Sequence, residues 1–464
     1  MFRLLEVGLL CAVGVAVLAF GGTTSSFFAI TQIIILGLGV VFLLSPQFSS
    51  VASMHFPVTS PLLLVALVLF QVCPLPVSLA PLLGRAQGQL PGLPHFFISV
   101  APYQTVSHLF LLVTYLTAFF LTLAVCRNRR AKKRLVYALV SLGVFETLYG
   151  LVQYLTGWQR IFTYVKKYYL EEATGTYINR NHFAGFMEMI LPFVVALGLL
   201  SMELMIKNTS EARASLPRLF SRRELFSLVL WFFLAILFFT VLVLSRSRMG
   251  IISALISIVT IVALAGAASM RTRTRAAFGA LFILGVLGLV VWIGSDSVMS
   301  RFETLGQEYH LDRQNRIAIW HDTIGLIRHH PFVGTGLGSF SVVYPSVQTV
   351  FLTLLVEHAH CDYLEVASDL GLPGAALVFG SVFWVLVQAV RQYRRPGDRF
   401  DNAVSLGCIG SITAILVHSL ADFNFYIPAN ALLFLIILAL ARSNASPSGN
   451  ASSAPQTPRN IGTA

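Results

Sequence analysis

The sequence predicts an all-α fold, a polytopic integral membrane protein with about 12 transmembrane helices. Only 11% of its 464 residues are charged, whereas soluble globular chains carry about 25%. Hydrophobic residues make up 56% of the chain, and the mean hydropathy is +0.77. The apolar residues also fall into runs close to the about 20 residues that cross a bilayer. These observations exclude a soluble globular protein.

The apolar runs define the expected spans. They are residues 4–20, 27–44, 61–77, 104–125, 135–155, 182–205, 226–244, 249–269, 277–293, 361–390, 403–421 and 427–441. The first run lacks a small-residue cleavage site and is followed by further spans, so we interpret it as a span and not as a signal peptide. The five cysteines are scattered without CxxC spacing, which predicts neither a disulfide framework nor a zinc site.

The basic residues indicate how the spans are oriented. If the N-terminus is cytoplasmic, most of the 32 Lys and Arg residues fall on the inside, in the segments 127–134, 207–223, 271–275 and 391–399. This asymmetry follows the positive-inside rule. Because the rule accounts for the net charge of +12, nucleic acid is not expected as a partner.

Three longer segments then lie outside, at residues 78–103, 156–181 and 294–360. The last of them carries several charges near its start, which suggests a small helical lid between spans 9 and 10. The tail is rich in Ser, Asn, Pro and Ala, as disordered tails are. The expected domains are transmembrane helices 1–9 (1–293), a periplasmic loop domain (294–360), transmembrane helices 10–12 (361–441) and a disordered cytoplasmic tail (442–464).

Two arginines, Arg246 and Arg248, occupy a very short outside turn between two spans. Charged side chains held at a membrane surface are costly and usually functional. A guanidinium group offers paired donors that match phosphate oxygens and keeps its charge at any working pH. The turn therefore predicts a phosphate clamp, with snorkelling towards lipid headgroups as the alternative.

A third arginine, Arg316, lies in the longest outside segment, four residues before Trp320. On a helix the two side chains would share a face. We interpret Arg316 as a second phosphate clamp. A surface salt bridge with Asp312 or Asp322 is the alternative.

His358, His360 and Asp362 precede the tenth span in the pattern His-x-His-x-Asp. Such spacing occurs in zinc sites, but no second cluster supplies further ligands. A general base is the better interpretation, because the positive end of a helix dipole disfavours the imidazolium form of a histidine beside it. A neutral His360 could then take a proton from a hydroxyl. An interfacial or helix-capping histidine is the alternative.

Other polar residues lie in or at the mouths of spans. Glu146 and Glu188 lie inside apparent spans, where carboxylates are rare and normally partnered. Glu146 could mark a proton or ion pathway, or could pair with a polar residue of another helix. Asn179, Asn181 and His182 open the sixth span, where an Asn caps a helix well. They could equally line a polar cavity for a sugar.

In these residues the chain resembles the O-antigen ligase and polymerase superfamily of bacterial envelope glycosyltransferases. Four stretches carry the resemblance: residues 71–76 followed by 80–81, Asn179-x-Asn181, Ser247-Arg248-x-Gly250, and residues 316–374. The ligases of that family show a His, usually then Asn, Ser or Gln, nine residues, and Gly-x-x-Gly. Here His360 and Cys361 precede nine residues and then Gly371 to Gly374, so that Cys361 departs from the usual pattern.

The resemblance implies an O-antigen ligase, a membrane glycosyltransferase at the periplasmic face of the bacterial inner membrane. It would transfer polysaccharide from undecaprenyl pyrophosphate to lipid A-core by a metal-independent, inverting mechanism, without a cofactor. Arg248 and Arg316 would bind the leaving pyrophosphate, and His360 would act as the base or position the acceptor. The remaining expected substrate contacts are Arg246, Asn179, Asn181, His358, Trp320, Asp362 and Glu365.

Two other functions stay open on the sequence. A polymerase that joins lipid-linked repeat units would share the same donor chemistry with a glycan acceptor. A membrane transporter would fit the number of spans and Glu146, but the two halves of the chain lack the similarly interrupted spans that transporters usually show. Besides the donor and the acceptor, only membrane lipids are expected as partners.

Overall fold

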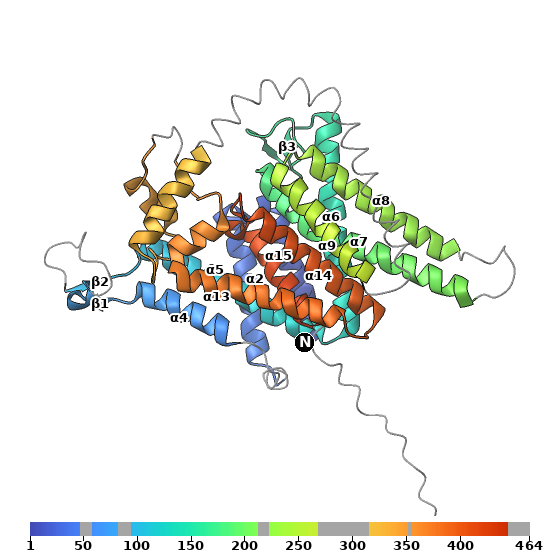
Figure 1. Ribbon diagram of the computed structural model, residues 1–464, viewed down its shortest axis with the longest axis horizontal. Helices are drawn as coiled ribbons and strands as arrows, with labels where there is room; N and C mark the ends of the chain where they lie inside the picture. The colour runs from blue at the N-terminus through green and yellow to red at the C-terminus, as the bar shows by residue number, and fades with distance from the viewer. Residues whose placement is uncertain (47–57, 82–93, 212–221, 268–314, 351–354, 444–464) are drawn as a thin grey trace, which may run out of the picture.

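A computed structural model describes residues 1–46, 58–81, 94–211, 222–267, 315–350 and 355–443, most of them helical (Figure 1). The helices are α1 (Phe2–Leu18), α2 (Ser25–Leu43), α4 (Thr59–Val72), α5 (Pro102–Cys126), α6 (Arg129–Thr156), α7 (Arg180–Glu211), α8 (Arg222–Leu244), α9 (Arg248–Ala267), α12 (Phe340–Val343), α13 (Asp362–Tyr393), α14 (Arg399–His418) and α15 (Pro428–Ser443). Residues 315–329 are also helical.

Strands are confined to two short antiparallel pairs within the described residues. They are β1 (Leu75–Pro76) with β2 (His95–Phe96), and β3 (Arg160–Ile161) with β4 (Tyr164–Val165). The pair β3 and β4 lies in a segment expected outside the membrane, as does β2, whereas β1 lies at the end of the expected span 61–77. The all-α fold class is therefore confirmed, with two small hairpins added at its surface.

The polytopic architecture is confirmed as well, although the described residues contain fewer long spans than the about 12 expected for the chain. Each expected span coincides with a helix, apart from 277–293, which lies outside the described residues. Eight of the described helices are long and apolar enough to cross a membrane. The helices α1, α4 and α15 have 17, 14 and 16 residues, fewer than the about 20 that a bilayer requires. Residues 315–329 and α12 fall within the predicted loop domain.

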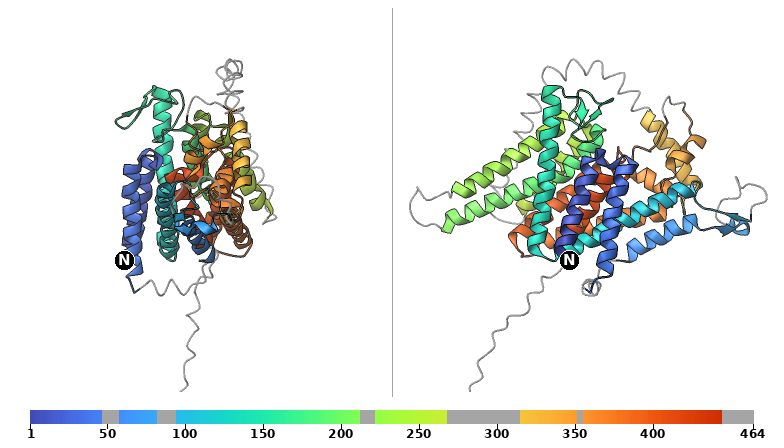
Figure 2. Two further views of the ribbon diagram at one scale, coloured as in Figure 1. Left: turned by 90° about the vertical axis from the view of Figure 1, so that its left-hand side faces the viewer. Right: turned by 180° about the vertical axis from the view of Figure 1, so that it is seen from behind.

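The helix α7 is the centre of the bundle, almost wholly buried among α6, α8, α9 and α14. Its closest neighbour is α14, which presents glycines to it. A Cβ atom on Gly407 would come within 2.5 Å of Phe193, and one on Gly410 within 2.8 Å of Pro192. The two backbones can approach this closely only because those positions lack side chains. The helices α1 and α2 form a layer on one side of the bundle (Figure 2).

One end of the bundle, here called the basic end, carries ion pairs between three helices. Arg129 of α6 pairs with Asp398 at the start of α14, and Lys132 pairs with Asp401 at 3.1 Å. Arg134 Nη2 lies 2.6 Å from Glu6 Oε2 of α1. The N-terminus and two of the segments expected in the cytoplasm therefore lie at one end of the molecule.

The opposite end, here called the site end, brings together segments expected on the other side of the membrane. The loop before α7 reaches α1 where Thr176 Oγ1 donates a hydrogen bond to the Val17 carbonyl. It reaches the turn between α8 and α9 where the Ala173 N–H donates to the Leu244 carbonyl. The helix of residues 315–329, yellow-orange in Figure 1, lies over the start of α13 at this end.

The long helix α13 is broken within its first half. Gly371 has φ +72° and ψ 171°, and the Leu372 N–H donates to the Pro331 carbonyl. A Cβ atom on Gly371 would meet the Phe332 carbonyl oxygen at 2.5 Å, so only glycine fits there. The sequence predicts a bend from Pro373, and the break lies two residues earlier.

Candidate active site

A short loop between α14 and α15, residues 419–427, anchors the site end and is called the anchor loop. It holds the first residue of α13, because the Asp362 N–H donates to the Ser419 and Asp422 carbonyls. In return Ser419 Oγ donates to Asp362 Oδ2 at 2.7 Å, and the Phe425 N–H donates to Oδ1 at 3.2 Å. The Asp362 side chain is fully buried, so its place in the structure is that of an anchor for α13.

Arg316 reaches the anchor loop from the helix of residues 315–329. Its Nη1 donates a hydrogen bond to the Ala421 carbonyl oxygen at 2.7 Å. One turn further along, Trp320 Nε1 donates to the Ala359 carbonyl oxygen at 3.0 Å. The two side chains share a helix face, as their spacing predicts, and bring Arg316 next to the segment 358–360.

The segment 358–360 is fixed from below by the buried carboxylate of Glu365. His358 Nδ1 lies 2.7 Å from Glu365 Oε1, and the Ala359 N–H donates to Oε2 at 2.7 Å. His360 then adopts φ +51°, which is uncommon for a residue with a side chain. The chain therefore turns sharply at His360 before α13 begins.

Phe423 of the anchor loop is surrounded by three histidine rings. His358 stacks on it with centroids 4.1 Å apart and planes 15° apart. His182 and His360 meet it edge-on, with centroids 4.9 and 5.1 Å away. Two of these histidines come from the segment before α13 and the third from the start of α7, so Phe423 joins distant parts of the sequence.

His358 and His360 differ in the charge that their surroundings favour. Burial lowers the pKa of His360, and the neighbouring Arg316 guanidinium lowers it further. Burial also disfavours the charged form of His358, but Glu365 outweighs it, and the pKa of His358 is raised. His360 therefore favours its neutral form, which can accept a proton, whereas His358 favours its charged form.

The arginine turn between α8 and α9 lies at the same end of the molecule. Arg246 Nη1 lies 3.3 Å from Glu171 Oε2 and 3.8 Å from Glu172 Oε1. Arg248 is the first residue of α9, and its side chain is exposed. The turn is thus packed against the loop before α7, and Arg248 faces outward from it.

Of the two asparagines at the start of α7, Asn179 fits the helix-capping alternative. Asn179 Oδ1 accepts a hydrogen bond from the Asn181 N–H at 2.8 Å, which satisfies a donor in the first turn of the helix. Asn181 is half-buried. The sequence offers Asp312 or Asp322 as alternative partners of Arg316. Asp312 lies outside the described residues, and Asp322 accepts hydrogen bonds from Tyr344 and Thr349.

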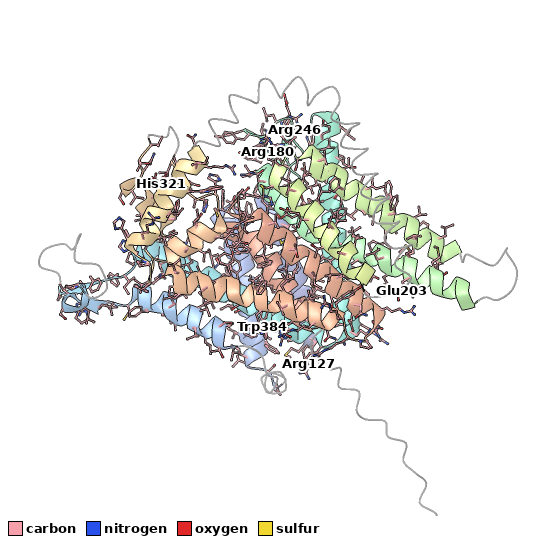
Figure 3. The ribbon with its side chains drawn as sticks, viewed as in Figure 1. Arg127, Arg180, Glu203, Arg246, His321 and Trp384 are labelled. Carbon is pink, nitrogen blue, oxygen red and sulfur yellow. The ribbon has the colours of Figure 1, made fainter. Side chains whose placement is uncertain are left out.

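Arg180 also lies at the site end, although its sequence context did not single it out. Its Nη1 donates to Glu172 Oε1 at 2.9 Å, and its guanidinium carbon lies 5.3 Å from the Tyr169 ring centroid. Burial raises the pKa of Tyr169, whose hydroxyl also feels Arg180, Glu172 and Arg316. Figure 3 shows Arg180 beside Arg246. The sequence signal that could have identified Arg180 is its place at the start of an expected span.

Beneath the site end lies a chain of buried ionisable groups. His418 Nδ1 is 3.0 Å from Glu188 Oε2, and His418 Nε2 is 3.7 Å from Asp422 Oδ2. All three side chains are buried. Intramembrane carboxylates are normally partnered, and Glu188 is paired as that rule predicts. Glu146 has a different partner, since it accepts hydrogen bonds from the Thr176 N–H and hydroxyl.

The side chains of the pattern His-x-His-x-Asp do not form one common metal site. His358 uses Nδ1 for Glu365, and Asp362 uses both carboxylate oxygens for the anchor loop. Within the described residues, no group of three or more His, Cys, Asp or Glu side chains could hold a metal ion.

An apolar cavity of about 570 Å³ leads from the site end into the membrane region between α4, α5, α13 and α15. It starts at Leu337 and Tyr426. The neighbouring Asp369 accepts hydrogen bonds from the Gly338 N–H and the Tyr426 hydroxyl. It continues along α13 as far as Val385 and is lined almost entirely by apolar side chains, among them Leu64, Leu111, Leu370, Phe434, Leu435 and Leu438.

Taken together, the bundle defines a multi-pass membrane protein with arginines and histidines gathered at one end above an apolar cavity. Comparison with known families agrees with this class. Residues 233–379 match the family described as O-Antigen ligase, so the chain carries this family's domain. The match covers α8 from residue 233, α9, the helix of residues 315–329 and the first half of α13. No curated protein matches the chain.

Proposed function

We propose that the protein is a ligase that transfers an O-antigen-type polysaccharide from undecaprenyl pyrophosphate to lipid A-core. The observation that carries this proposal is the meeting of Arg316 and His360 around the anchor loop, directly beside the apolar cavity. A lipid-linked pyrophosphate needs a cation, a base and an apolar passage at one place. The site end offers all three, and Arg316 and His360 lie within the residues that match the family.

The proposed reaction is a direct displacement at the anomeric carbon of the donor sugar. The acceptor hydroxyl oxygen forms the new glycosidic bond, while the bond between the anomeric carbon and the pyrophosphate oxygen breaks. His360 takes the hydroxyl proton, and the arginines stabilise the negative charge of the leaving pyrophosphate. Arg316 and Arg248 are the proposed clamps. Pyrophosphate leaves as an anion and needs no proton, so neither a metal nor a cofactor enters the scheme.

The remaining predicted contacts receive narrower roles in this proposal. Trp320 and Glu365 position the segment 358–360, and Asp362 anchors α13. His358, which favours its charged form, would bind a phosphate oxygen or a sugar hydroxyl. Arg246 and the asparagines would border the glycan, which extends away from the membrane.

The apolar cavity would hold the first isoprene units of the donor. A tryptophan in place of Leu435 would fill the cavity at a distance from the polar site. We expect Leu435→Trp to raise KM for an undecaprenyl donor more than KM for a short-chain prenyl donor. Phe383→Trp, on an exposed face of α13, is the matched control and should change neither. Equal effects on both donors would remove the cavity from the proposal.

The proposed location is the bacterial inner membrane, with the site end in the periplasm. The ion pairs at the basic end support this orientation, because they gather segments that the positive-inside rule assigns to the cytoplasm. Single cysteines near residues 130 and 395 should resist an impermeant thiol reagent in intact cells, whereas one near residue 170 should react. Labelling at residue 395 from outside would reverse the orientation.

A strain that lacks the protein distinguishes the ligase from the alternatives. The proposal predicts that finished polysaccharide accumulates on the lipid carrier while lipid A-core stays unmodified. Accumulated single repeat units would instead identify a polymerase. A defect cured by supplying a small solute, with normal envelope glycan, would point to a transporter.

A further inference from the structure

A second cavity, of about 350 Å³, lies at the basic end of the bundle between α7, α9, α14 and the turn that follows α13. Glu203 of α7 borders it, and 23 residues separate Glu203 from Arg180 at the site end, about 35 Å along a helix. Figure 3 shows these two residues far apart. The cavity is therefore separate from the candidate active site and takes no part in the proposed transfer.

The walls of this cavity are of two kinds. Its floor is apolar and consists of small and aliphatic side chains from the helices, namely Ala196, Leu199, Leu200, Ala265, Ala403 and Leu406. Its rim is polar and basic, with Glu203, Tyr393, Arg394, Arg395, Arg399 and Asn402. An apolar floor beneath a cationic rim matches a molecule with an anionic head and a hydrocarbon tail.

The charge of the rim is positive after its internal pairing. Arg399 Nε lies 3.8 Å from Glu203 Oε1, and Glu203 is the one carboxylate among the lining residues. Arg394 and Arg395 are exposed, and neither has a carboxylate partner in the described part of the chain. The nearby carboxylate of Asp398 pairs with Arg129 outside the cavity. Two guanidinium groups thus remain available at the rim.

We propose that this cavity is a binding site for an anionic phospholipid of the leaflet at the basic end. The guanidinium groups of Arg394 and Arg395 bind the phosphodiester, since paired N–H donors match phosphate oxygens. The beginning of an acyl chain lies on the floor between α7, α9 and α14. Basic pockets between transmembrane helices on the cytoplasmic side bind anionic headgroups in this way. A soluble phosphate would use the rim but not the floor.

The test is native mass spectrometry of the full-length protein in detergent, titrated with dioleoyl phosphatidylglycerol or with dioleoyl phosphatidylcholine. We expect the anionic lipid to bind about tenfold more tightly, and Arg394→Gln/Arg395→Gln to lose about that factor. Arg127→Gln/Arg130→Gln removes two exposed charges from the same end outside the cavity and should leave binding unchanged.

Two further arms separate the lipid from a soluble anion. Ala403→Trp fills the floor and should weaken phosphatidylglycerol binding, while millimolar inorganic phosphate should not displace the lipid. Equal binding of the two lipids, or equal losses in the two double variants, would overturn the proposal. Displacement by inorganic phosphate would assign the rim to a soluble anion. These outcomes are independent of transfer activity.

Discussion

The two ends of the helix bundle use their charged residues in different ways. At the basic end, arginine and lysine pair with aspartate or glutamate from other helices, and several partners are exposed, such as Arg129 with Asp398. At the site end, Arg180 and Arg246 also pair with Glu172, but Arg316 donates to a backbone carbonyl, and three histidines pack around Phe423. Exposed pairs contribute little to stability. Holding a half-buried arginine against a neutral carbonyl is costly, which is why Arg316 indicates function.

Substitutions of the arginines test this comparison first, because the largest effect on the transfer rate is expected there. Arg316→Ala and Arg248→Ala should each lower the transfer rate by roughly 30- to 1000-fold, because a charge-assisted contact in the transition state contributes about 2–4 kcal/mol. Arg248→Lys should also be impaired, since an ammonium group does not replace the guanidinium fork. Reconstituted transfer with folded protein is the measurement. Near-normal transfer in both alanine variants would leave only the snorkelling explanation for Arg248.

The next largest effect is expected at the buried pair of His418 and Glu188 beneath the site end, and it concerns the free energy of unfolding. His418→Ala leaves the Glu188 carboxylate buried without its partner, and breaking a buried pair costs about 3–5 kcal/mol. Glu188→Leu/His418→Leu/Asp422→Asn also removes the charge of Asp422, the second partner of His418, and should cost less. Unfolding in mixed micelles measures both variants. A triple variant at least as unstable as the single one would show that the charge is not the cause.

The pH dependence of transfer should reflect His360. Its pKa is lowered from 6.5, so the neutral base persists to lower pH than an ordinary histidine would allow. Transfer should therefore still exceed half of its maximum at pH 6.5 and reach its midpoint only at a lower pH. The pH profile of the rate is the measurement, and a midpoint above 6.5 would contradict the assignment. Arg129→Gln should leave the profile unchanged.

The smallest effect is expected at the basic end. Arg129→Gln removes an exposed ion pair with Asp398, whose contribution should stay within about 1 kcal/mol. Transfer should be unaffected. A loss comparable to that of His418→Ala would show that the two ends do not differ in the way proposed.

The sequence predicts most of the fold, because apolar runs of span length are strong local signals. The described helices coincide with the expected spans to within a few residues, and Pro373 predicts a bend in α13 two residues beyond the observed break at Gly371. The number of long spans is harder to predict, because α4 and α15 are short apolar helices that depend on packing against α5 and α13.

The candidate site is only partly predictable. Arg316 and Trp320 share a helix face, as their spacing indicates. The anchor loop was missed because its contribution consists of backbone carbonyls and the ring of Phe423, which carry no sequence signature. Contacts between α7, α14 and the segment before α13 are long-range, and spacing along one chain does not reveal them.

In the proposed mechanism His360 and Arg316 form the reacting site, and His358 supports it. The sharpest test compares transfer by His358→Ala and His360→Ala, assayed side by side with purified protein in excess EDTA. We expect an active wild type, no detectable transfer by His360→Ala, and some remaining transfer by His358→Ala. Equal loss in the two variants, together with a wild type that needs added zinc, would contradict this mechanism and favour a metal site.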